Sequence, residues 1–156
     1  MYSASTVAAA IVQKAIDEGN PVTQMKLQKM AYFAQGYNLA RKEEKLFKEE
    51  IQAWKFGPVV PVIYNDYKLY GNNPITDFEK ALNSYSLLGK CHIDFDDDLR
   101  DALDYTWKAT GNLTAFSLSN WTHLPGSPWQ QVYNPRDQSI IIDSERIKEY
   151  FKEIIY

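Results

Sequence analysis

The residues with the most reactive side chains, Cys91 and His92, are neighbours in the chain. A cysteine beside a histidine could form a nucleophile and its base, but adjacent residues on an extended segment point to opposite faces. A metal site would need further cysteines or histidines at ligand spacing, and the sequence has one cysteine and two histidines in all. We therefore expect neither a catalytic pair nor a metal site at this position.

A run of acidic residues is the second candidate for chemistry. It consists of Asp94, Asp96, Asp97, Asp98, Asp101 and Asp104. Clustered carboxylates could hold a divalent cation, but the run lacks the glycine and the terminal glutamate of a calcium-binding loop. Aspartates in the first turn of a helix interact favourably with its dipole, so capping and solvation explain most of the run. The alternative is an acidic surface that meets a basic partner.

Phosphate-binding glycine loops and nucleophile elbows do not occur in the sequence. We therefore expect a protein that is not an enzyme, with no catalytic residues, no metal and no cofactor. The remaining enzymatic alternative places His123 with a nearby acid and hydroxyl in a small pocket.

The elements that position these residues follow from hydrophobic periodicity and from glycine and proline. Helices are predicted over 5–18, over 24–41 with Thr23 as N-cap, over 59–70, from Asp96 or Asp97 to Gly111, from Thr114 to Thr122, and from Ser144 onward. Extended segments are predicted at 46–55 and 139–142, whereas 75–95 has no clear period. The pattern predicts a mainly α fold: a single compact helical domain over residues 1–156 with a small short-stranded β component.

Composition narrows the class of protein further. The chain has 156 residues, 45% of them hydrophobic and 14% aromatic, which is typical of a folded globular domain. Its formal net charge is -3, without a sustained basic stripe, so nucleic-acid binding is disfavoured. The first ten residues lack the pattern of a signal peptide, and no stretch of about 18 apolar residues occurs. We expect a cytoplasmic protein that does not enter the membrane.

Three segments carry more specific patterns. In the first, Lys26 is followed by Lys29, Tyr32 and Gln35 at intervals of three on the predicted helix 24–41. This spacing places the last three on one side, apart from the apolar stripe. They are candidates for a polar functional surface, or alternatively for a buried hydrogen-bond network that ties the helix to the other two segments.

The second segment runs from Trp54 to Tyr64 and contains a sharp strand-to-helix turn. Gly57 permits close backbone approach there, and Pro58 is expected to start the next helix. Trp54 could anchor an interface, although a core position is favoured because large aromatic rings dominate cores as well.

The third segment covers 118–129 and is predicted to be a helix end followed by a stiff turn through Pro128 that delivers Trp129. His123, next to Thr122, stands where it could cap the last carbonyls of the helix or contact a partner. For Trp129, as for Trp54, the core is favoured over an interface.

Together the three segments resemble the Panacea antitoxin domain, a family that includes SocA-like proteolytic adaptors and GepA-type proteins of phages and prophages. The resemblance covers about 8–151. The residues that match the family pattern are Lys26, Leu27, Lys29, Tyr32, Gln35, Trp54, Gly57, Pro58, Val59, Tyr64, Ser119, Thr122, His123, Pro128 and Trp129.

This resemblance implies an antitoxin that binds and neutralises a cognate protein toxin encoded nearby. The partner is then the toxin, and the motif residues are the candidates for binding it. Two alternatives follow from the same family: an adaptor that delivers a toxin or another client to a AAA+ protease, and a protein-binding module encoded by a phage or prophage.

Overall fold

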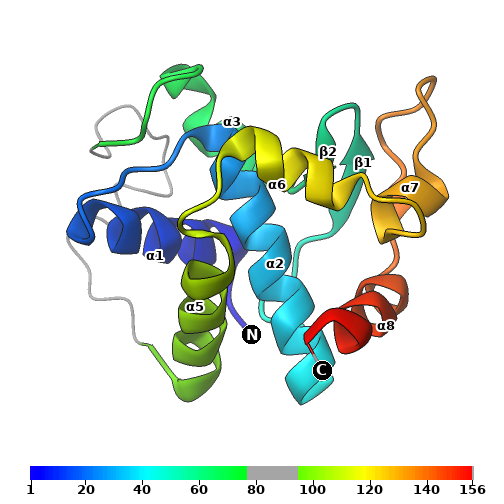
Figure 1. Ribbon diagram of the computed structural model, residues 1–156, viewed down its shortest axis with the longest axis horizontal. Coiled ribbons are helices and arrows are strands. Elements are labelled where there is room, and N and C mark those ends of the chain that lie inside the picture. The colour runs from blue at the N-terminus through cyan, green and yellow to red at the C-terminus, as the bar shows by residue number, and fades with distance from the viewer. Residues whose placement is uncertain (77–94, 156) are drawn as a thin grey trace.

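The computed structural model describes residues 1–76 and 95–155 and confirms the mainly α fold. The elements are α1 (Ala4–Asp17), α2 (Gln24–Lys42), β1 (Ile51–Trp54), β2 (Gly57–Val59), α3 (Pro61–Tyr67), the 3-10 helix η1 (Lys68–Tyr70), α5 (Asp97–Thr110), α6 (Ala115–Thr122), α7 (Pro128–Val132), β3 (Ile141–Ile142) and α8 (Ser144–Ile155). Most of the helices surround α2, and the strands β1 and β2 lie beside it (Figure 1).

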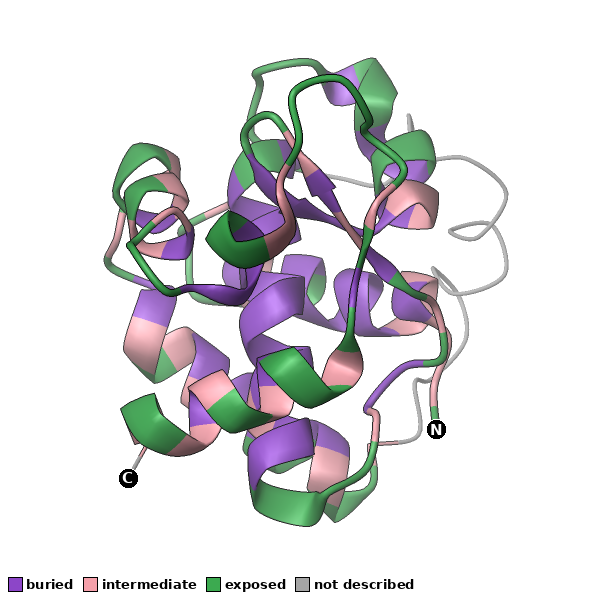
Figure 2. Ribbon diagram, turned by 90° about the vertical axis from the view of Figure 1, so that its right-hand side faces the viewer, coloured by how far each residue is buried: buried purple, intermediate pink, exposed green. Residues whose placement is uncertain are grey.

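The central helix α2 organises the core. Helices α1, α3, α5, α6 and α8 and strand β2 all pack against it, and 15 of its 19 residues are buried. Figure 2 shows the buried residues gathered in the interior of the molecule, with the exposed ones on the outer faces of the surrounding elements. Small residues allow close approach: a Cβ at Gly36 would collide with the ring of Phe151 on α8. A helix covered on all sides has no face left for water.

The enclosure of α2 forces its polar side chains to find partners inside the protein. The Gln35 amide accepts hydrogen bonds from the backbone N–H groups of Leu46 (2.7 Å) and Phe47 (3.2 Å), and it donates to the Phe47 carbonyl at 2.9 Å. Two turns earlier, the Gln28 amide accepts from the N–H of Val60 at 2.9 Å and donates to its carbonyl at 3.3 Å. Both glutamines therefore bond to backbone groups as a neighbouring strand would, and the segment at Phe47 is paired on another side with Tyr2.

The strands form a sheet in the order β2-β1-β3, with both pairings antiparallel. Pro58 pairs with Ala53 in β2, so the expectation that it starts a helix is wrong. An edge strand tolerates proline because one side of the strand makes no ladder hydrogen bonds. The next helix, α3, begins instead at Pro61, where the missing N–H costs nothing. The predicted helix 59–70 is therefore shorter and ends in the 3-10 turn η1.

Local capping explains why most of the helices were predicted near their observed bounds. The side chains of Thr23, Asp96 and Thr114 accept hydrogen bonds from the N–H groups of Lys26, Leu99 and Ser117, respectively. Each satisfies a donor that the helix itself leaves open. The short helix α7, capped by Ser127, was expected only as a turn. The segment 75–95, for which the sequence shows no clear period, lies mostly outside the described residues. Cys91, His92 and Asp94 lie outside them as well.

The hydrogen bonds of Gln35 predict a large loss of stability on its replacement. Gln35→Met keeps the length of the side chain but leaves two buried N–H groups and one carbonyl without a partner. We expect a loss of about 2–4 kcal/mol in the free energy of unfolding, measured by urea denaturation. Gln13→Met on the exposed face of α1 is the control and should change it by less than about 0.5 kcal/mol. Equal effects of the two substitutions would refute the role given to Gln35.

Candidate functional site

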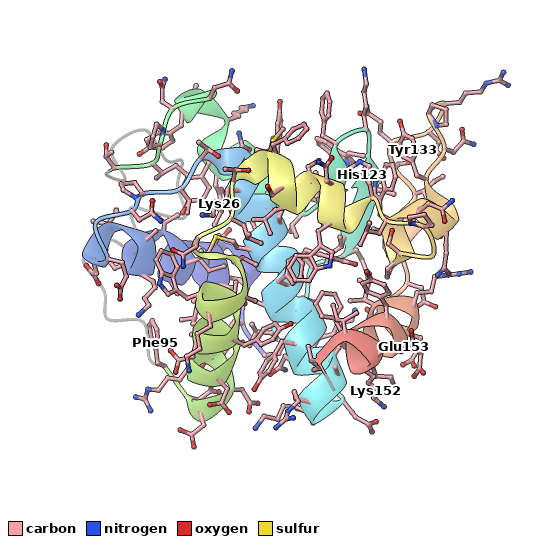
Figure 3. All side chains as sticks on the ribbon, in the orientation of Figure 1. Lys26, Phe95, His123, Tyr133, Lys152 and Glu153 are labelled. Carbon is pink, nitrogen blue, oxygen red and sulfur yellow. The ribbon has the colours of Figure 1, made fainter. Side chains whose placement is uncertain are left out.

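The three sequence segments meet at the turn between β1 and β2. Trp129 donates its indole N–H to the carbonyl of Trp54 at 2.7 Å. The Ser119 hydroxyl donates to the carbonyl of Phe56 at 3.1 Å, and Nε2 of His123 lies 3.4 Å from the carbonyl oxygen of Lys55. Figure 3 shows His123 at the end of α6, beside this hairpin. Three successive carbonyls of the turn are thus held by side chains from α6 and α7.

Gly57 closes the turn in a conformation that other residues rarely adopt, with φ +118°. A Cβ at this position would lie 2.8 Å from Cε of Lys29 and 3.0 Å from Oγ1 of Thr122. The glycine is therefore required both by its backbone angle and by the close approach of α2 and α6. The expectation of close backbone approach at Gly57 is confirmed.

Lys29 is buried at this junction, with 1% of its surface exposed. Within residues 1–76 and 95–155, no hydrogen bond or ion pair compensates its ammonium group. Burial lowers the pKa of Lys29 from 10.5 to about 8, because removal from water disfavours the charged form. The interpretation of Lys29 as part of an exposed polar surface is therefore wrong.

Tyr32 and Gln35 are buried as well, at 2% each. The Tyr32 ring packs edge-on against Phe33 and Phe151, and burial raises the pKa of its hydroxyl, which has no hydrogen-bond partner among the described residues. Gln35 bonds to the segment before β1 and not to the motif turns. The interpretation of these side chains as an exposed polar surface is wrong because this part of α2 is covered on all sides. They are buried as the alternative expects, but the hydrogen-bond network to the two motif turns is not found among the described residues, where only Gln35 is hydrogen-bonded, to Leu46 and Phe47.

Lys26 also points inward, away from the hairpin. Its ammonium donates to the carbonyl of Gly111 at 2.8 Å, and burial lowers its pKa. The contact joins the start of α2 to the connection between α5 and α6. A partner at the hairpin would not reach this group.

His123 serves as the C-cap residue of α6, as one of its two predicted roles requires. Its Nδ1 contacts the carbonyl of Ser119, and its ring centroid lies 3.9 Å from that of Trp129. Both ring nitrogens therefore face backbone carbonyls, and the single N–H of a neutral ring can donate to one of them. Among the described residues, no carboxylate is hydrogen-bonded to His123, so the acid that the enzymatic alternative needs is not beside it there.

The remaining aromatic and proline residues of the segments divide into core and surface. Trp129 is buried, as are Pro58 and Pro128, so the core position favoured for Trp129 is confirmed. Trp54 is half-buried, and its ring lies 5.3 Å from that of Tyr64, which is 41% exposed. Trp54 thus lies at the boundary between the core and the surface.

Sequence reasoning missed two residues that matter at this site. Gln28 holds the end of the hairpin through Val60, and its spacing of seven from Gln35 on one helix face was the available signal. Phe56 at the tip of the turn is 58% exposed although it is a large apolar side chain. Nothing in its spacing distinguished it from a core phenylalanine.

We call the exposed apolar side chains around the turn the hairpin face. It consists of Phe56, Tyr64 and Leu124, exposed by 58%, 41% and 46%, together with the half-buried Trp54, whose ring lies next to that of Tyr64, and the half-buried His123, which lies beside Lys55. The backbone beneath it is fixed by the side chains of α6 and α7. A surface on a fixed backbone suits protein recognition, because little conformational entropy is lost when a partner binds.

Neither metal binding nor membrane insertion is indicated by the part of the chain that the structure describes. No group of three or more His, Cys, Asp or Glu side chains could hold a metal ion among residues 1–76 and 95–155. No described helix is sufficiently long and apolar to cross a bilayer.

The burial of Lys29 predicts a stability that depends on pH. Between about pH 8 and pH 10.5 the unfolded chain binds the proton and the folded one does not, so the free energy of unfolding rises with pH in this window. Below pH 8 the cost of the buried charge is fully present. The stability gained by Lys29→Met should therefore shrink by about 2–3 kcal/mol from pH 7 to pH 10.

Urea denaturation of the original chain and of Lys29→Met across this pH range measures the difference between their free energies of unfolding. The titration of all other groups contributes equally to both proteins and cancels in this difference. Lys108→Met, at an exposed position on α5, is the control and should give a difference independent of pH. A constant difference for Lys29→Met would show that its ammonium is not desolvated.

Comparison with known proteins places the chain in a family. The family model described as "Antitoxin SocA-like, Panacea domain" matches residues 27–130. Antitoxin SocA of Caulobacter vibrioides (strain NA1000 / CB15N) is 31% identical over 135 residues, which cover 84% of this chain and 70% of the relative. No solved structure matches the chain. On the family model and the relative together, the chain belongs to the SocA-like antitoxin family with the Panacea domain.

Proposed function

We propose that this chain is an antitoxin that neutralises a cognate protein toxin by binding it directly through the hairpin face. The likeness to antitoxin SocA supports the antitoxin role. The observation that carries the mode of action is the hairpin face itself, where the exposed ring of Phe56 stands on a turn held by α6 and α7, and the exposed side chains of Tyr64 on α3 and Leu124 after α6 accompany it. No reaction is needed, because occupying the toxin's surface is enough to block it.

The motif residues act here mainly as a scaffold. Trp129, His123 and Ser119 hold the carbonyls of the turn, and Gly57 allows Lys29 to approach it. The binding energy then comes from Phe56 and its exposed neighbours, because a few well-placed aromatic anchors dominate most protein interfaces. The toxin is expected to offer an apolar recess that receives Phe56.

The first test is growth of a bacterial culture that expresses the reading frame encoded next to this chain from an inducible promoter. Growth should stop when the neighbour is expressed alone and resume when this chain is supplied in trans. The two proteins should then co-purify without added nucleotide or metal. A harmless neighbour, or a toxic one that forms no complex, would reject the proposal.

Substitutions on the hairpin face test the mode of binding. Phe56→Ser should weaken the affinity for the toxin by about 30-fold, which corresponds to the loss of roughly 2 kcal/mol from one anchor. Leu69→Ser is the matched control, because Leu69 in η1 is 60% exposed and lies outside the hairpin face. Equal affinities of the two variants, measured by calorimetry, would place the interface elsewhere.

The bacterial strain that expresses the toxic neighbour also distinguishes blocking of the toxin's surface from delivery of the toxin to a protease. Direct neutralisation predicts that growth is rescued equally when AAA+ proteases are deleted, with the toxin level unchanged. Rescue that requires a protease and removes the toxin would favour the adaptor alternative over the proposal.

A further inference from the structure

The carboxylates of the chain are absent from the segments that form the hairpin face. The sequence has 20 aspartate and glutamate residues, and none of them occurs in 51–65 or 105–136. These ranges contain β1, β2 and most of α3, and further along the end of α5 and the whole of α6 and α7. All residues of the hairpin face lie in them. The chain as a whole is acidic, with a formal net charge of -3, so the hairpin face differs in charge from the rest of the molecule.

Outside these segments many opposite charges are paired within the chain. The acidic run at the start of α5 is an example, where the Asp96 carboxylate caps the helix by accepting a hydrogen bond from the N–H of Leu99 at 2.9 Å. Asp98 and Asp101 each lie 3.5 Å from the ammonium of Lys42 at the end of α2. Further cations that form an ion pair with a carboxylate are Lys14, Lys45, Lys148 and Lys152.

The acidic residues that flank the hairpin and α7 in the sequence make contacts of their own. Glu50, before β1, lies 3.4 Å from the ammonium of Lys45. Asp66 on α3 is buried, and its carboxylate accepts a hydrogen bond from a serine hydroxyl of α1 at 2.6 Å. Asp137 accepts hydrogen bonds from the serine two residues after it, and the neighbouring Arg136 carries the opposite charge. These carboxylates do not give the hairpin face a net negative charge.

Lys55 places an exposed positive charge at the tip of the hairpin. Its ammonium lies 5.4 Å from the centroid of the Phe56 ring, and within residues 1–76 and 95–155 no carboxylate is paired with it. The aromatic ring attracts the ammonium but does not neutralise it. The charge of Lys55 and the apolar ring of Phe56 therefore face a partner together.

Lys29 adds a second positive charge beneath the same turn. Its ammonium is buried behind Gly57, where a Cβ would lie 3.0 Å from Nζ. Thr122, the other close neighbour of this position, is uncharged. Burial lowers the pKa of Lys29 to about 8, so most of these side chains are still protonated at pH 7. Because a buried charge is screened less than an exposed one, it contributes a positive potential to the turn above it.

We propose that the toxin carries one or more carboxylates at the rim of the recess that receives Phe56, and that these pair with the ammonium of Lys55. This pairing rests on the proposed function, and it specifies the chemistry of the partner surface. Charges at the edge of an interface steer the approach of the partners and repel surfaces of the wrong charge. The charge of Lys29 acts in the same direction, because it attracts the same carboxylates. A toxin with a basic rim would be excluded.

The distribution of these cations favours a protein over a nucleic acid as the partner. Affinity for nucleic acid grows with the number of phosphates that a protein neutralises, and this requires a patch or stripe of basic residues. The exposed cations of the two acid-free ranges are instead dispersed: Lys55 lies on the hairpin, Lys108 on α5 and Arg136 in the loop before β3. One cation beside an apolar ring fits a carboxylate next to an apolar recess.

The test measures the rate of association with the toxin encoded by the neighbouring reading frame, by stopped flow at low and at high salt. The control is Lys48→Glu, which changes the net charge equally at an exposed lysine before β1, whereas Lys55 follows this strand. Lys55→Glu should associate about tenfold more slowly than Lys48→Glu at low salt. The difference should largely vanish at high salt, where exposed charges are screened. Equal rates of the two variants at low salt would overturn the proposal.

Exchange of charges between the partners identifies the carboxylate. Each exposed aspartate and glutamate of the toxin is replaced by lysine in turn, and at least one such toxin should bind the Lys55→Glu chain about tenfold more tightly than the original chain. Absence of this reversal from every toxin variant would overturn the proposal. If Lys55→Glu does not fold, Lys55→Met should still slow association at low salt, and an unchanged rate would overturn it too.

The outcomes for this pairing and for the proposed function differ. A neighbouring protein that does not bind the original chain at all rejects the proposed function and the pairing with it. A toxin that binds the original chain and Lys55→Glu alike rejects the pairing alone. A labelled oligonucleotide that binds the original chain and is lost in Lys55→Glu, with unchanged affinity for the toxin, would also overturn the pairing and would assign the charge of Lys55 to a nucleic acid.

Discussion

The structure depends on the enclosure of one polar helix. α2 carries Gln28, Lys29, Gln35 and Asn38 into the interior, where a polar group without a partner is costly. Three of these side chains bond to backbone groups of the chain that follows: Gln35 at Phe47, Gln28 at Val60 and Asn38 at Glu44. Since the two glutamines are seven residues apart, they fix the two ends of the hairpin on the same side of α2.

Much of the fold was predictable because residues at the ends of the helices mark where they begin. Thr23, Asp96 and Thr114 are N-caps that can be recognised from the sequence, and the amphipathic pattern of α8 needs no knowledge of its neighbours. The three-residue strand β2 and the five-residue helix α7 are too short for a period, so only their tertiary contacts define them. Pro58 in β2 resembles a proline at the start of a helix in the sequence, because a strand of three residues shows no alternation that would identify it.

The candidate site was predictable in its membership and not in its arrangement. The three segments singled out in the sequence meet at one turn. The error concerned which side chains face outward. A helical pattern separates polar from apolar positions only where one side of the helix meets water, and α2 has no such side. Lys29 and Tyr32 therefore support the site from within, whereas Phe56, which belongs to no pattern, stands on its surface.

The way in which the turn is held bears on how a binding surface of this kind can vary. Trp129, His123 and Ser119 contact the carbonyls of residues 54–56, and every amino acid carries a carbonyl. The side chains of Lys55 and Phe56 contact each other, with the ammonium 5.4 Å from the ring centroid, and they are not needed to hold the turn. Replacing them changes the shape and charge of the tip without moving its backbone. A scaffold fixed through backbone atoms thus separates the stability of the turn from the identity of the residues that it presents.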